Sequence, residues 1–201
     1  KYNVSVHGKA LLDAQGIKRI NKVGETLGDE VFSKLPLFRT KNHPSFFGKN
    51  GVNKLLDTSN RVTIHLDNTP APMGKSYGVL AFYRPSEMMI RVGRSTVTRL
   101  KPSLRLGGGF NVGKDVGSVL RHEYAHHLEE FVNCRPIYRV YNTLSPKEIK
   151  KLVGEYAASS QSEFFAECFS AYTSPLYGQK YRLSQDIEEA LELIFGRRVD
   201  L

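Results

Sequence analysis

The chain has 201 residues, of which 40% are hydrophobic and 10% aromatic. This length and composition suffice for one domain, residues 1–201, with a buried core, and they exclude an intrinsically disordered chain. Cys134 and Cys168 are too few for a disulfide scaffold and lack the spacing of a zinc ribbon, so we expect buried thiols. No apolar run reaches the roughly 18 residues that cross a bilayer, so we expect no membrane span.

The net charge of +9 is distributed unevenly, with +12 over residues 1–114 and −3 over residues 115–201. A basic segment can contact nucleic acid, a membrane surface or acidic substrates, but it is more often a solvated surface. No aromatic-rich recognition motif accompanies the charge, so we expect nucleic-acid binding to be weak at most. We divide the domain into a basic part, residues 1–114, with a helix and a sheet, and a helical part, residues 115–201.

The basic part shows the pattern of one helix followed by a small sheet. Residues 16–34 place apolar side chains at three- and four-residue spacings, which is typical of an amphipathic helix. Residues 61–66 alternate apolar and polar side chains, which predicts a half-buried strand. Residues 78–83 and 88–92 flank a short turn that contains Pro85, which predicts a hairpin.

Helices dominate the rest of the chain. The first is expected over residues 115–131, with Asp115 as its N-cap. The second is expected to begin after Ser145, because Pro146 suits the first helical position and Glu148 stands at capping-box spacing from Ser145. Two more are expected from about Ser160 and after Ser184. The order of helix, sheet and helices predicts an α+β fold with a small, mostly antiparallel sheet.

The motif with the clearest chemistry is His122-Glu123-Tyr124-Ala125-His126, an H-E-x-x-H pattern on a predicted helix. His122 and His126 lie one turn apart on the same face, so both imidazoles can bind one zinc ion while Glu123 projects beside them. The alternative is a solvated helix face with two incidental histidines. Because helix faces seldom gather two histidines and a glutamate without a use, we favour the metal.

A catalytic zinc takes three protein ligands and leaves one position for water, so a third ligand must lie elsewhere. His127 is rotated by about 100° from His126 around the helix axis, so we expect it at the surface or behind the ligands. Glu163 is the better candidate, because it begins an apolar helix that would pack on the metal helix. Ser160 and Glu163 also have capping-box spacing, so Glu163 could instead serve the helix end.

The segments HEYAHHLEEF and YAASSQSEFFAECFSAYTS resemble the catalytic domain of anthrax lethal factor and its relatives, which include the Pro-Pro endopeptidases. The resemblance implies a zincin-like fold in which an active-site helix is followed by a glutamate helix. It implies that His122, His126 and Glu163 bind zinc, that Glu123 is the general base, and that Tyr156 stabilises the oxyanion. For Tyr156, the alternative is an ordinary half-buried tyrosine.

The resemblance covers residues 115–195, and residues 1–114 match only in the order of helix, strands and hairpin. Similar domains occur in phage head proteins and bacterial polymorphic toxins, so a delivered effector or a phage-associated protein is the implied setting. Independently, Glu167 lies one turn after Glu163 and could accept the second ring N–H of a ligand histidine. Glu129 and Glu130 are expected to form only the solvated end of the metal helix.

The leading expectation is a zinc-dependent endopeptidase with one zinc per chain and a polypeptide substrate, which would bind as an extra strand beside residues 88–92. Two alternatives remain open. One is a nucleic-acid-associated metalloprotease module, which the basic segment would serve. The other is a zinc-stabilised interaction domain without turnover in a phage structural protein, although a closed structural site would not need Glu123 as a base.

Overall fold

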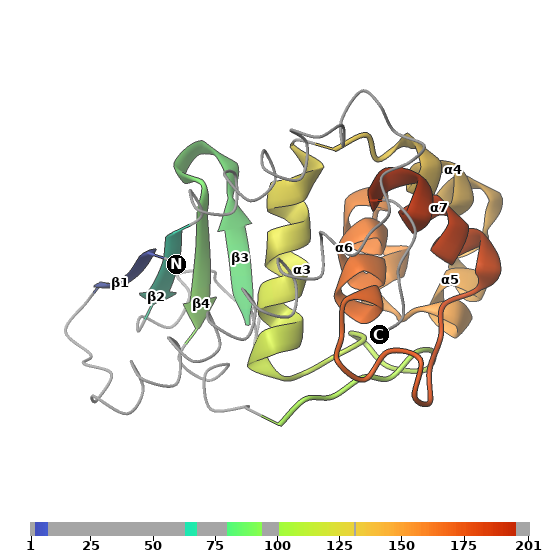
Figure 1. Ribbon diagram of the computed structural model, residues 1–201, viewed down its shortest axis with the longest axis horizontal. Coiled ribbons are helices and arrows are strands. Elements are labelled where there is room, and N and C mark those ends of the chain that lie inside the picture. The colour runs from blue at the N-terminus through green and yellow to red at the C-terminus, as the bar shows by residue number, and fades with distance from the viewer. Residues whose placement is uncertain (1–2, 8–62, 68–79, 94–100, 131, 196–201) are drawn as a thin grey trace.

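The computed structural model describes residues 3–7, 63–67, 80–93, 101–130 and 132–195. In Figure 1, the sheet lies on one side of helix α3 (Val116–Glu129) and the other helices lie on the opposite side. This mixture of helices and one small sheet confirms the α+β class. The helix predicted over residues 16–34 lies outside the described residues.

Four strands make up the described sheet, in the order β1-β2-β4-β3. Their bounds are β1 (Asn3–His7), β2 (Thr63–Asp67), β3 (Ala81–Arg84) and β4 (Met89–Gly93). The expectation of a mostly antiparallel sheet is wrong, because β1 and β4 both run parallel to β2. The sequence predicted the local hairpin, but it gave no signal that the hairpin would place β4 next to β2.

The predicted hairpin is confirmed, since β3 and β4 pair antiparallel, with Tyr83 opposite Ile90. The short 3₁₀ turn η3 (Pro85–Glu87) joins the strands, and the Met88 N–H closes it by donating to the Pro85 carbonyl at 3.0 Å. Among the described strands, β4 is interior and β3 is at the edge. The sequence expectation that residues 88–92 form the edge is therefore wrong, because that segment is covered on both sides by strands.

The four helices predicted after residue 114 are all present. Asp115 caps α3 by accepting from the Ser118 N–H at 3.1 Å, and Ser145 and Glu148 form the predicted capping box. One helix, α4, was not predicted, although Pro136 occupies its first turn. No helix in the described part of the chain is long and apolar enough to span a bilayer. The helices after α3 are α4 (Arg135–Thr143), α5 (Pro146–Leu152), α6 (Gln161–Tyr172) and α7 (Gln185–Phe195).

The core forms where α3 and α6 pack together, with β3 against the other side of α3 (Figure 1). Phe165 and Phe169 on α6 are fully buried, and both rings contact Phe195 on α7. Cys134 and Cys168 are buried free thiols, as expected. The packing of apolar side chains between α3 and α6 fixes the two helices that carry the predicted metal ligands.

A glycine-rich loop that precedes α3 is hydrogen-bonded to the segment that carries Tyr156. Gly107 has a φ of +70°, and its N–H donates to the Val153 carbonyl at 2.9 Å. A Cβ at Gly107 would lie 2.4 Å from the backbone oxygen of Lys151, so only glycine fits. Farther along the loop, the Phe110 carbonyl accepts from the Tyr156 N–H at 2.8 Å. The loop thereby fixes the start of the 3₁₀ turn η4 (Tyr156–Ala158).

Candidate metal centre

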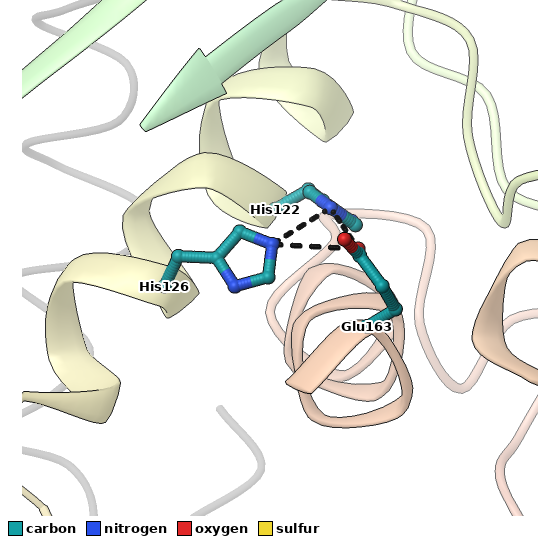
Figure 2. Close-up of side chains that lie close together, drawn as sticks. All are labelled: His122, His126 and Glu163. Atoms are coloured by element: carbon teal, nitrogen blue, oxygen red, sulfur yellow. Dashed lines mark hydrogen bonds and ion pairs between the residues drawn. The ribbon is translucent and has the colours of Figure 1, made fainter. Parts of the chain in front are cut away.

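Three predicted ligands converge between α3 and α6, as Figure 2 shows. The Nε2 atoms of His122 and His126 are 3.2 Å apart. The Oε2 atom of Glu163 lies 2.9 Å from His122 Nε2 and 3.4 Å from His126 Nε2. Within the described ranges, these side chains form the group whose geometry could hold a metal ion.

The triangle of donor atoms has the size that a tetrahedral zinc ion requires. Donors about 2.0–2.1 Å from one ion at tetrahedral angles are separated by about 3.3 Å, and the three separations here run from 2.9 to 3.4 Å. Two imidazoles and one carboxylate are also a common ligand set of catalytic zinc. Within the described ranges the group has three members, which is the number of protein ligands in a catalytic zinc site rather than in a closed structural one.

Glu163 forms only half of the capping box that the sequence left open. Its backbone N–H donates to Ser160 Oγ at 3.1 Å, which caps α6. Its carboxylate extends away from that cap toward His122 and His126. The backbone of Glu163 therefore takes part in the helix cap, whereas its carboxylate contacts the two histidines of the centre.

Charge is concentrated where the three side chains meet. Burial alone would raise the pKa of Glu163, but hydrogen bonds from His122 and His126 outweigh it and hold that pKa well below its usual range. Burial alone would lower the pKa of both histidines, but the carboxylates outweigh it and raise the pKa to about 10 for His122 and to about 9 for His126. The centre therefore attracts positive charge strongly, as protons or as a cation.

Glu123 lies beside the triangle and is buried, with 7% of its surface exposed. Burial raises its pKa, and the charges of His122 and His126 oppose that rise. The Tyr83 backbone N–H, on edge strand β3, also stabilises the charged carboxylate. A carboxylate with a raised pKa is a stronger proton acceptor than an ordinary one, as a general base requires.

Tyr156 approaches the centre from η4, and its hydroxyl donates to Glu163 Oε1 at 3.1 Å. Its ring stacks between Phe110 and His122, with centroid distances of 5.3 and 5.7 Å. Burial and the nearby Glu163 carboxylate raise the pKa of Tyr156 above its usual value of 10, so the hydroxyl stays a donor. The alternative of an unrelated half-buried tyrosine does not explain why the hydroxyl contacts the predicted third ligand, Glu163.

Glu167 lies behind His122, where the sequence had placed it. Its Oε1 atom is 2.7 Å from His122 Nδ1, and its Oε2 accepts from the Val112 N–H at 2.6 Å. With 1% of its surface exposed, the carboxylate is held between a loop amide and an imidazole. It can therefore fix the tautomer and ring orientation of His122.

Comparison with known proteins adds nothing to the resemblance: no family model and no curated protein matches this sequence. The likeness to lethal factor domains therefore stays a prediction carried by the motif residues. The case for a function depends on the chain's own side chains.

The structure corrects two sequence expectations near the metal helix. Of the two places expected for His127, the surface is wrong, because the side chain is fully buried and its Nδ1 lies 2.7 Å from the Tyr83 hydroxyl. Glu129 is not a solvated helix end, because it accepts from Ser162 Oγ at 2.6 Å, whereas Glu130 is exposed as expected. Both errors arise because the partners of His127 and Glu129 come from segments distant in sequence. No sequence pattern had pointed to Ser162 as a partner of Glu129.

Proposed function

We propose that the chain is a zinc-dependent endopeptidase of the zincin type. The observation that carries this proposal is the triangle of His122 Nε2, His126 Nε2 and Glu163 Oε2, with sides of 2.9 to 3.4 Å. The packing of α3 on α6, with β3 beside α3, supports the zincin assignment. One zinc ion would be held by these three side chains, with its fourth position left for water.

The neighbouring residues supply what peptide hydrolysis needs besides the ion. When bound, zinc polarises the scissile carbonyl and lowers the pKa of water toward about 7. Glu123 accepts the proton of the attacking water and passes it to the leaving amide nitrogen. Tyr156 donates its hydroxyl hydrogen bond to the carbonyl oxygen as negative charge develops there. Glu167 holds the His122 ring in place.

The substrate we propose is an extended polypeptide that adds to the edge of β3. In the described sheet, β3 pairs with β4 on one side only, and it packs against α3. Main-chain hydrogen bonds to an edge strand set the register of a bound peptide. Phe110, with 58% of its surface exposed, stacks on Tyr156 and offers an apolar contact near the reacting bond.

The two alternatives receive less support from the centre. A purely structural zinc site is closed by four protein ligands, and it gives no reason for a buried carboxylate such as Glu123 beside three ligands. A nucleic-acid role would depend on the basic residues of the first 114 positions, most of which lie outside the described ranges. Hydrolysis of peptides is therefore the function we put forward.

The test is digestion of a peptide library by the zinc-loaded protein, with cleavage sites read by mass spectrometry. The variant Glu123→Gln keeps the size of the side chain and removes its basicity, so it should retain zinc and lose cleavage. Glu130→Gln removes the same charge from an exposed position at the C-terminal end of α3 and should cleave normally. Equal cleavage by the unmodified protein and Glu123→Gln, or no cleavage with zinc bound, would contradict the proposal.

A further inference from the structure

The two histidines of the centre have different partners at their second ring nitrogens. His122 Nδ1 lies 2.7 Å from the Glu167 carboxylate. His126 Nδ1 instead lies 3.0 Å from the hydroxyl oxygen of Ser162, and 3.5 Å from Glu129 Oε2. The contact of His126 is therefore made through a hydroxyl, which can either donate or accept a hydrogen bond.

The direction of that hydrogen bond follows from the other contact of Ser162. Its hydroxyl has a single proton, and Glu129 Oε2 lies 2.6 Å away as an acceptor. That proton is donated to Glu129, so Ser162 has no second proton to offer to His126. Ser162 Oγ is then left to accept, and His126 Nδ1 must carry the hydrogen. The lone pair of the neutral ring is thus placed on Nε2, the atom that faces Glu163.

Glu129 is held from a second side. The Tyr138 hydroxyl on α4 donates to its other carboxylate oxygen. Side-chain exposure of Glu129 is 22%, and that of His126 is 17%, so water competes only in part for these contacts. The four side chains of Tyr138, Glu129, Ser162 and His126 thus connect α4, the end of α3 and the start of α6.

We propose that Ser162 and Glu129 act as a positioning relay that keeps His126 in the Nδ1–H tautomer, with Nε2 free to bind metal. This inference rests on the proposed metal centre and adds to it two residues that neither motif nor resemblance singled out. Neither residue touches the reacting atoms. Ser162 and Glu129 act only by orienting the His126 ring, so their substitution should first change the affinity of the centre for metal.

The relay is tested by zinc competition against a chromophoric chelator, using the whole chain stripped of metal and reloaded. Partners behind a ligand histidine typically contribute about 10- to 100-fold in metal affinity, so Ser162→Ala should weaken zinc binding by that factor. Ser162→Thr keeps the hydroxyl and should restore most of the affinity. Glu129→Gln should give a smaller loss, because a neutral amide oxygen is a weaker acceptor than a carboxylate.

The control is Glu130→Gln, which removes the same charge at the next position of the chain and should leave zinc affinity unchanged. Thermal melting of the stripped proteins separates folding from binding, since the relay predicts similar midpoints for the Ser162→Ala and unmodified chains. The relay is refuted if Ser162→Ala and Glu129→Gln bind zinc within twofold of the unmodified protein. It is also refuted if Glu130→Gln loses as much affinity as they do. In either case, zinc binding and cleavage by the unmodified chain would leave the proposed function standing, whereas failure of the unmodified chain to bind zinc would remove both.

Discussion

Replacement of Tyr156 by phenylalanine isolates one hydroxyl group within the proposed catalytic centre. The ring is held by stacking on Phe110 and His122 at 5.3 and 5.7 Å, and phenylalanine keeps both contacts. The hydroxyl contacts Glu163 Oε1, which is not the oxygen that faces the histidines. The substitution should therefore leave the ligand triangle intact and remove only the donor to the developing oxyanion.

Removal of one such donor typically costs about 10²–10³ in kcat, or about 3–4 kcal/mol at the barrier. We expect Tyr156→Phe to lower kcat by about 10²-fold with little change in KM, because the interaction forms mainly in the transition state. The assay is steady-state hydrolysis of a fluorogenic peptide taken from the library digest, with zinc content measured in parallel. Tyr141→Phe is the matched control, because its hydroxyl contacts the Ala158 carbonyl, away from the ligands. A kcat within threefold of the unmodified value, or a loss explained by reduced zinc content, would refute the oxyanion role.

Further predictions concern the ligand, the pH dependence, the core and the basic segment. Glu163→Ala should weaken zinc binding by more than about 100-fold in a chelator competition, since it removes a ligand rather than a partner behind one; unchanged affinity would exclude Glu163. In the stripped protein, the raised pKa values of about 10 for His122 and about 9 for His126 stabilise the fold fully below the unfolded value of 6.5. Its thermal midpoint should therefore fall as pH rises through those values, and zinc should oppose the fall because it binds deprotonated imidazoles; a flat profile would contradict the pairing. Phe169→Ala should lower the free energy of unfolding by about 3–5 kcal/mol in denaturant titrations, because the ring is fully buried among α3, α6 and α7 neighbours; a loss below 1 kcal/mol would contradict the core assignment. Filter binding at physiological salt should give dissociation constants for DNA or RNA no tighter than the order of 10⁻⁶ M; nanomolar affinity would revive the nucleic-acid alternative.

Local signals in the sequence predicted the helical part well. The caps at Asp115 and Ser145 marked the starts of α3 and α5, because capping depends on residues within one turn. The spacing of His122 and His126 placed both rings on one face for the same local reason. Those features needed no knowledge of distant parts of the chain.

Features set by distant segments could not be predicted in the same way. The parallel pairing of β2 with β4 depends on how the β3–β4 hairpin packs against β2, and no residue pattern within either strand predicts it. The partner of Glu129 is Ser162, 33 positions away, so its exposed-looking sequence context was misleading. The position of Glu163 on an apolar helix made it a candidate for the third ligand, but its spacing from Ser160 is equally that of a cap. The prediction that Glu163 binds the metal therefore depended on the resemblance.

The packing of α3 on α6 has a consequence for how the protein would exchange the proposed zinc ion. Most buried apolar side chains of both helices belong to one cluster, so we expect that cluster to hold the two backbones together without the ligands. In small zinc-dependent folds, by contrast, metal binding and chain folding are a single event, and chelation unfolds the chain. Here the donors are preorganised, so little of the binding free energy is spent on ordering the chain. Chelation should leave an intact scaffold that regains its ion from solution, and the occupancy of the centre should follow the surrounding zinc concentration reversibly.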